Sequence, residues 1–268
     1  MKELLKTISL YESLKLNEVY NFEKFNSFAI TAHSTQVEGS TLTKEETQLF
    51  LDENITPGGK PLEHILMVKD HQDALNFVCS EGKKVSMFIT PQLVQFINSK
   101  VMKSSDKVVE TILGHVDCTK GEYRKSSVIA GTSTFPSHTK IDVLVKKFCN
   151  DLNESIIKVN TKESALELSY AAHFHLVSIH PFYDGNGRTS RLLMNLIQQH
   201  FKLPLSTVYK RDKLEYFESL KESRKEESIK PIVDFMSDQH NKFLTEQMAP
   251  ILEQKENKSR NKGFSFFL

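Results

Sequence analysis

Apolar residues recur at helical spacing through most of the chain. In residues 61–81, for example, Ile65, Val68, Leu75 and Val78 follow one another at intervals of three or seven positions, which places them on one face of a helix. Glycine and proline, which interrupt helices, number only 10 and 8. The pattern therefore predicts a mainly α-helical protein.

The same spacing, combined with capping signals, places the individual helices. Thr43 followed by Glu46 forms a capping box at a helix start, and Thr90 before Pro91 marks another. Gly39 ends the second helix, and 56–61 is a turn. The expected helices cover residues 2–20, 22–38, 43–53, 61–81, 90–102, 139–156, 161–180, 188–201, 211–227 and 231–247.

One stretch, 114–138, departs from this pattern. It is rich in glycine, serine, threonine and β-branched residues, which favours a short hairpin or an extended loop. We expect an N-terminal helical region over 1–85, a core domain over 86–247 that carries the hairpin, and a mobile tail over 248–268. The role of the apolar end of this tail, 264–268, stays open.

Composition narrows the class of protein. Hydrophobic residues make up 39% and charged residues 26%, and 35 Lys and Arg against 34 Asp and Glu give a net charge of +1. This balance indicates neither a nucleic-acid partner nor a membrane segment. The first residues lack a signal-peptide pattern, and Cys79, Cys118 and Cys149 show no CxxC spacing. We expect a cytoplasmic, soluble protein with buried free thiols.

The stretch "HPFYDGNGRTSRLL", residues 180–193, carries the candidate chemistry. Gly185 and Gly187 can adopt positive φ, and Asn186 tolerates the left-handed region. Alternating conformations of this kind turn successive N–H groups into an anion-binding nest, beside the positive N-terminal end of the next helix. The stretch therefore predicts a phosphate site. A plain turn between helices is the simpler interpretation of the glycines alone.

The charged residues favour the phosphate interpretation. Arg188, Arg191 and Asn195 are spaced to share one helix face, where two guanidinium groups can hold several phosphate oxygens. Asp184 supplies a hard oxygen ligand for Mg²⁺, and His180 a base that titrates near neutral pH. Together they predict attack by a hydroxyl on a nucleoside triphosphate, which needs positioning and charge neutralisation.

The stretch closely resembles the signature of the Fic/Doc superfamily, HPFx[D/E]GNGRxxR, and every fixed position is matched. The resemblance implies a helical core with a β-hairpin flap, here 121–138, whose usual entry matches Gly121, Tyr123 and Arg124. It also implies protein AMPylation, in which AMP passes from MgATP to a Ser, Thr or Tyr hydroxyl of a target protein.

The resemblance also implies roles for individual residues. His180 is the general base, Asp184 holds Mg²⁺, and Phe182 points into the core and fixes the loop. Nucleotide binding falls to Gly185, Asn186, Gly187, Arg188, Arg191, Asn195 and Tyr216, and binding of the target backbone to flap residues Ser127, Val128, Ile129 and Ala130.

A second stretch, "STQVEG" at 34–39, resembles the inhibitory-helix pattern of the same family, [S/T]xxxE[G/N], through Ser34, Glu38 and Gly39. Ser34 and Glu38 are four positions apart and face the same way on a helix. The resemblance implies that Glu38 pairs with Arg191 in place of the ATP γ-phosphate, so that the protein inhibits itself. The alternative is an ordinary exposed acid at a helix end.

Other interpretations of the chain stay open. The same site could remove AMP from a target by hydrolysis or transfer another nucleotide such as UMP, and a protein of another class would only bind and sense nucleotides. Self-modification and a homodimer are compatible with the sequence. His173 and His175 point to different sides of a helix, which favours packing over metal binding.

Overall fold

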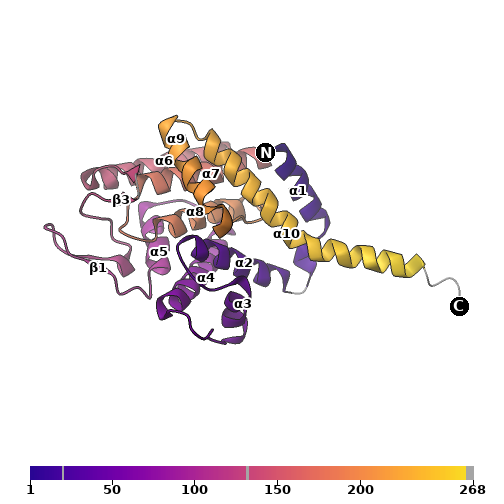
Figure 1. Cartoon of the computed structure of the whole chain (residues 1–268). Coiled ribbons are helices and arrows are strands. Elements are labelled where there is room, and N and C mark those ends of the chain that lie inside the picture. Colours follow the sequence, from indigo (N-terminus) through magenta and orange to yellow (C-terminus); the bar gives the residue numbers. More distant parts are fainter. Residues whose placement is uncertain (20, 131–132, 264–268) are drawn as a thin grey trace.

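Helices make up most of the structure, a computed structural model that describes residues 1–19, 21–130 and 133–263 (Figure 1). The predicted mainly α-helical fold class is confirmed. The α-helices are α1 (Lys2–Ser13), α2 (Phe22–Val37), α3 (Lys44–Glu53), α4 (Leu62–Gly82), α5 (Pro91–Val101), α6 (Ile141–Lys158), α7 (Lys162–Ile179), α8 (Asn186–His200), α9 (Lys213–Lys225) and α10 (Lys230–Gly263).

The capping signals behave as expected. The Thr43 side chain accepts from the Glu46 N–H, and the Glu46 carboxylate accepts from the Thr43 N–H, so the capping box is complete. Thr90 caps α5 by accepting from the Leu93 N–H, and Pro91 is its first residue. Because these signals act within one helical turn, the sequence alone places the starts of both helices.

Both ends of the chain differ from the prediction. The helix expected over 2–20 ends at Ser13, because Lys15 adopts the left-handed region with φ +49° and a 3₁₀ turn, Leu16–Glu18, follows. At the other end α10 continues to Gly263, so the expected tail over 248–268 begins inside a helix whose Met248 is buried in an apolar cluster. The segment 264–268 lies outside the described residues.

Two short antiparallel hairpins interrupt the helices between α5 and α6. In the first, β1 (Val108–Val109) pairs with β2 (Val116–Asp117); in the second, β3 (Ile129–Ala130) pairs with β4 (Ser133–Thr134). The sequence predicted one hairpin within 114–138, and the first one, which starts earlier, was missed. Strands of two residues are too short to show the alternation that identifies a strand.

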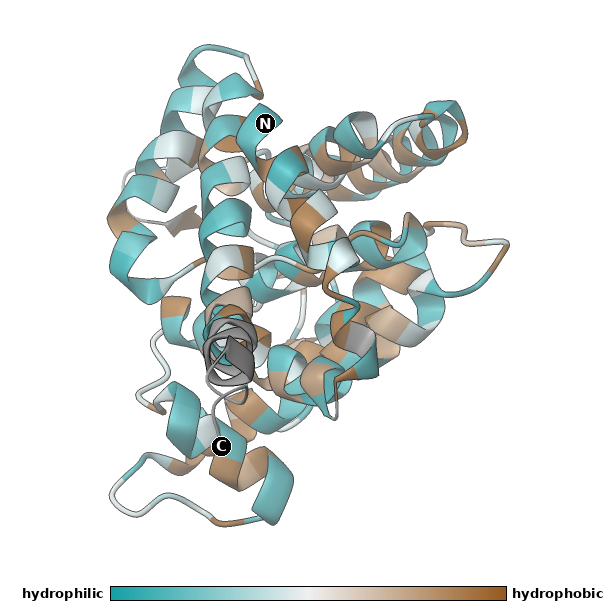
Figure 2. Cartoon of the chain, turned by 90° about the vertical axis from the view of Figure 1, so that its right-hand side faces the viewer, coloured by the Kyte–Doolittle hydropathy of each residue, from teal (hydrophilic) through white to brown (hydrophobic). Residues whose placement is uncertain are grey.

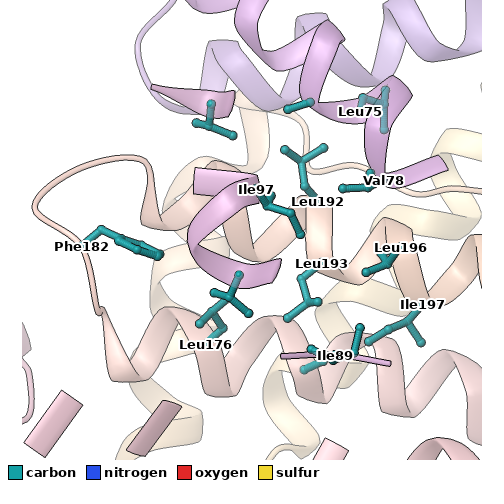
Figure 3. Packing of buried hydrophobic residues seen from close by; sticks show 14 of the residues in the cluster. Leu75, Val78, Ile89, Ile97, Leu176, Phe182, Leu192, Leu193, Leu196 and Ile197 are labelled. Atoms are coloured by element: carbon teal, nitrogen blue, oxygen red, sulfur yellow. The ribbon is translucent and has the colours of Figure 1, made fainter. Parts of the chain in front are cut away.

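Helix α8 lies at the centre of the fold, against α4, α5 and α7. Its residues Leu192, Leu193, Leu196 and Ile197 are fully buried, and Figure 3 shows them among side chains of the surrounding helices, with Phe182 pointing in from its loop. The arginines of α8 are buried as well. The helix face that carries Arg188 and Arg191 is therefore not a solvent-exposed one, because neighbouring elements cover α8 on every side.

A second apolar cluster joins α1, α7, α9 and α10. Helices α1 and α10 pack side by side in this cluster (Figure 1). Hydrophilic residues predominate on the outward faces of the helices, and hydrophobic residues gather where helices meet (Figure 2). Within the described part of the chain, no helix combines the length and apolarity needed to span a membrane.

Candidate active site

The loop between α7 and α8 is a short, internally braced turn. Helix α7 ends at Ile179, and His180, its C-cap residue, has φ +52° and donates its N–H to the Leu176 carbonyl. The Asn186 side chain accepts from the Phe182 N–H at 3.0 Å and donates to the Phe182 carbonyl at 2.8 Å. Phe182 itself is 1% exposed, as predicted for a residue that fixes the loop. The turn therefore fixes the direction in which α8 starts.

The start of α8 has part of the backbone geometry that the predicted nest requires. Gly185 has positive φ, +74°, whereas Asn186 and Gly187 are the first residues of α8. The left-handed Gly185 is thus followed by the right-handed Asn186, the alternation that brings successive N–H groups into one concavity. The N-terminal end of α8, whose first N–H groups have no partner within the helix, continues this arrangement.

Gly187 is needed because of the space beside it, and not because of its backbone conformation. A Cβ atom at this position would lie 2.3 Å from Glu38 Oε1 and 3.1 Å from an Arg191 nitrogen. The missing side chain thus leaves room for a carboxylate at the positive end of α8. The sequence predicted an anion here, and the anion present is the protein's own Glu38.

Glu38 and Ser34 both bind Arg191. Arg191 Nη2 donates to Glu38 Oε1 at 2.7 Å and to the Ser34 carbonyl at 3.0 Å, and its Nε donates to Ser34 Oγ at 2.9 Å. Burial raises the pKa of Glu38, but the charges of Arg191 and Arg188 outweigh this effect and the pKa is lowered. The pair is therefore ionised at neutral pH, with Arg191 2% and Glu38 30% exposed.

Helix α2, which presents Ser34 and whose C-cap residue is Glu38, is held from two sides. Thr31 donates to Gln72 Oε1 at 2.9 Å and lies 3.1 Å from His71 Nδ1, both on α4. On another side the His33 ring packs against that of Tyr209, with ring centroids 4.4 Å apart and planes inclined by 49°. These contacts fix Glu38 in front of α8 through the position of its helix.

Asp184 lies between two cationic side chains. Its Oδ2 accepts from Lys107 Nζ at 2.8 Å, and its Oδ1 accepts from Arg188 Nη2 at 3.3 Å and from the Gly185 N–H at 2.6 Å. Burial raises the pKa of Asp184, but the hydrogen bond from Lys107 and the charge of Arg188 lower it by more, so the pKa lies below its usual value. The carboxylate is therefore ionised and, at 40% exposure, open to solvent.

Arg188 faces the interior. Besides Asp184, its guanidinium contacts the Val101 carbonyl at 3.5 Å and Met102 Sδ at 3.4 Å, and its Nε has no partner among the residues that the structure describes. Asn98 of α5 completes this side of the site by donating to the Asp184 carbonyl at 3.1 Å. Lys107 and Asn98 were missed by the sequence, where neither stands near a recognisable motif.

The His180 ring lies against the flap. It stacks on Phe135 with ring centroids 4.0 Å apart and planes inclined by 20°. Burial, with smaller contributions from the charges of Arg124 and Arg224, lowers the pKa of His180 to about 4. At neutral pH the imidazole is therefore uncharged and able to accept a proton.

This low pKa predicts an unusual pH profile. A histidine base acts in its neutral form, which exists above its pKa. For the AMP transfer that the family resemblance implies, kcat/KM of a Glu38→Gly variant should therefore stay constant from pH 8 to pH 5.5. If the pKa of His180 were the ordinary 6.5, kcat/KM would fall about 30-fold by pH 5. Initial rates with labelled ATP measure the profile, and an acid limb centred near pH 6.5 would contradict it.

Arg124 connects the flap to the loop. Its guanidinium donates to the carbonyls of His180 at 2.8 Å, Ser126 at 2.8 Å and Pro136 at 2.6 Å, and it is 2% exposed. Tyr183 assists, because its hydroxyl accepts from the Lys125 N–H at 3.2 Å. The sequence placed Arg124 at the entry of the flap but indicated no role for it. Its contacts with three carbonyls show that Arg124 anchors the flap to the loop.

Replacing Arg124 with methionine should destabilise the protein by about 3 kcal/mol, because three carbonyls lose a charged donor while the apolar stem is kept. The free energy of unfolding in urea measures this loss. The matched control is Arg211→Met, which removes a 56% exposed partner of Glu246 and should cost less than about 1 kcal/mol. Equal losses in the two variants would contradict the anchoring role.

The remaining predicted site residues lie deeper than expected. Asn195 donates to the Ser206 carbonyl at 2.9 Å and so holds the segment after α8. The Tyr216 hydroxyl lies 2.7 Å from His173 Nε2, both buried, which agrees with a packing role for His173. His175 is exposed on another side of α7. Neither Asn195 nor Tyr216 turns its polar atom towards open solvent.

The flap residues are only partly described. Ile129 and Ala130 form β3, with Ser127 and Val128 leading into it, and residues 131–132 of the flap lie outside the described ranges. Ile129 is 72% exposed and Ser127 is also exposed. The strand is therefore accessible to a partner, while the binding of a target by these residues stays a prediction.

Comparison with known sequences agrees with this geometry. The model of the Fic/DOC family matches residues 88–198. Two curated relatives are named "Protein adenylyltransferase Fic": the Drosophila virilis protein is 32% identical over 84% of this chain, and the Drosophila willistoni protein 33% identical over 79%. The chain spans 45% and 40% of their respective lengths.

Solved structures share the fold. A Fic domain containing signaling protein from Bacteroides thetaiotaomicron aligns with a TM-score of 0.79 at 22% identity, covering 92% of this chain and 95% of that chain. Fic-1 (residues 134–508) from C. elegans aligns with a TM-score of 0.77 at 23% identity, covering 94% of this chain and 73% of that chain. The overall fold of this chain thus resembles that of solved Fic structures.

Proposed function

The chain belongs to the Fic/Doc superfamily, and from this premise we propose that it is an auto-inhibited protein adenylyltransferase. Its substrates are ATP and a hydroxyl group of a target protein. The name of its curated relatives, protein adenylyltransferase, supports the reaction class. The inhibition is proposed from the contacts of Glu38.

One observation carries the proposal. An ionised carboxylate, that of Glu38, lies at the N-terminal end of α8 against Gly187 and is bound by Arg191. Helix N-termini and buried arginines bind phosphate by the same interactions that bind a carboxylate. Glu38 therefore stands in for a terminal phosphate group, and a triphosphate can take this position only if Glu38 leaves it.

The reaction follows from the placement of His180 beside this position. Neutral His180 takes the proton of the target hydroxyl, whose oxygen forms a bond to the α-phosphorus of ATP. The bond from the α-phosphorus to the oxygen that bridges to the β-phosphate breaks, and pyrophosphate leaves with the electron pair. Arg191 and the N–H groups at the start of α8 neutralise the charge on the phosphates.

Asp184 is the residue that would hold Mg²⁺. Its ionised, 40% exposed carboxylate offers hard oxygen ligands, and Mg²⁺ in nucleotide sites commonly takes one or two carboxylates together with phosphate oxygens. A bound ion would neutralise charge on the phosphates. No cluster of three or more His, Cys, Asp or Glu side chains occurs in the described residues.

Mass spectrometry tests the proposal. The Glu38→Gly variant, incubated with ATP, Mg²⁺ and cell extract, should add AMP to a protein hydroxyl, on a target or on itself. Calorimetry on the same variant measures ATP binding independently. Binding without any transferred AMP would contradict the transferase function and favour a nucleotide-sensing protein.

The exposure of Glu38 favours a second activity on the same site. Its carboxylate is ionised and 30% exposed while Oε1 binds Arg191, so it can orient a water molecule at the position of the phosphates. Hydrolytic removal of AMP from a modified target would follow. A target that has been AMPylated by the Glu38→Gly variant should then lose its label when wild-type protein is added, and retain it with Glu38→Gly alone.

A further inference from the structure

The β1–β2 hairpin, residues 108–117, extends outward from the helical body beside the candidate site (Figure 1). Its tip presents two large aliphatic side chains to solvent, Ile112 at 102% and Leu113 at 57% exposure, and Val108 on β1 is 51% exposed. Aliphatic side chains exposed next to one another on a projecting element are typical of a binding surface.

The tip is a defined turn. Thr111 and Gly114 exchange backbone hydrogen bonds at 3.2 and 3.0 Å. Thr111 Oγ1 donates to the Gly114 carbonyl at 2.6 Å and accepts from the Leu113 N–H at 3.1 Å. Gly114 has φ +94°, which favours glycine. Because the turn is already ordered, the hairpin loses little conformational entropy when a partner binds it.

The base of the hairpin is joined to the site. Lys107, which precedes β1, pairs with Asp184 at 2.8 Å, and its carbonyl accepts from the Cys118 N–H at 3.1 Å. Lys125 at the start of the flap donates to the His115 carbonyl at 3.1 Å. The tip therefore keeps a fixed position relative to His180 and to the flap.

We propose that Ile112 and Leu113 dock the protein substrate, by entering a shallow apolar hollow on a folded target while the flap holds the segment that carries the hydroxyl. The inference rests on the proposed transferase function. A folded protein cannot enter the site and must rest on its rim, which is formed by this hairpin and by the flap with its exposed Ile129. Glu110 directly precedes the turn at 111–114, and its negative charge disfavours an anionic membrane as the partner.

The first experiment uses benzoylphenylalanine in place of Ile112, within the full-length Glu38→Gly protein. The protein is irradiated in cell extract with an alkyne-tagged ATP. We expect a covalent adduct with a protein that also carries the AMP label. The same photoreactive residue in place of Val85, which is 98% exposed between α4 and α5, should give no adduct with that protein.

The second experiment measures transfer to the protein so identified. In the Glu38→Gly background, Ile112→Ser combined with Leu113→Ser should raise KM for the target by about 10- to 100-fold, while ATP affinity measured by calorimetry stays within about twofold. Val85→Ser is the matched control and should leave KM unchanged. Failure of the double variant to change KM would overturn the docking role even though transfer proceeds.

Two further outcomes separate the docking role from the transferase function. An adduct formed only with a second copy of the chain, or only with proteins that carry no label, would overturn docking of the substrate. Absence of labelled protein with Glu38→Gly, despite bound ATP, would instead overturn the transferase function on which the inference rests.

Discussion

Replacing Glu38 with glycine is expected to raise AMP incorporation by about 100-fold over the wild-type protein. The substitution removes the carboxylate that binds Arg191 at 2.7 Å and lies where a Gly187 side chain would be. Removing one partner of a charged hydrogen-bonded pair changes the free energy by about 2–5 kcal/mol. Each 1.4 kcal/mol corresponds to about a tenfold change in an equilibrium constant. Incorporation of α-labelled ATP into protein measures the effect.

Two controls isolate the role of the carboxylate. Glu53→Gly introduces the same substitution at the exposed end of α3 and should leave incorporation at the wild-type level. Glu38→Gln keeps the shape of the side chain but removes its charge, and should give an intermediate increase. Equal incorporation by wild-type and Glu38→Gly proteins would show that Glu38 does not compete with ATP.

Replacing His180 with asparagine in the Glu38→Gly background should lower AMP transfer by about 10²- to 10⁴-fold, the contribution of a positioned general base. Asparagine is preferred to alanine because residue 180 has φ +52°, a conformation that asparagine adopts more readily. ATP affinity should change by less than about threefold, because the proposed phosphate ligands are Arg191 and the start of α8. Rates with labelled ATP and calorimetry give the two quantities.

The control for this variant lies on the same helix. His175→Asn changes an exposed histidine of α7 and should leave the transfer rate unchanged. Thermal unfolding of both variants establishes that the fold is kept. Transfer by His180→Asn at more than half the rate of its parent would exclude a role for His180 as the base.

The local features of the site could be predicted because their interactions are local. The capping box of Thr43 and the apolar face of α8 both join residues within about one helical turn. The two hydrogen bonds between Asn186 and the Phe182 backbone are equally local, but the sequence did not predict them. The signature at 180–191 also places its residues on one short loop and the helix that follows. The φ preferences of glycine anticipated the left-handed Gly185, but they permit a helix start equally well and so did not show that Asn186 and Gly187 already belong to α8.

Contacts across the fold could not be derived from spacing. Lys107 and Asp184 are 77 positions apart, Arg124 and His180 are 56 apart, and Glu38 and Arg191 are 153 apart. Only the family resemblance suggested the last of these pairs, and no pattern pointed to Lys107 or to Arg124 as anchor of the flap. Such pairs depend on how α2, the hairpins and α8 pack together.

The sequence by itself determined the helical class, most helix positions and the chemical character of residues 180–191, because propensity, capping and side-chain periodicity act over a few residues. The tertiary structure alone decided that a carboxylate faces the start of α8, that a lysine holds Asp184, and that His180 is buried enough to stay neutral. Charge pairing and burial depend on distances in space, which hydrophobic packing of distant segments sets.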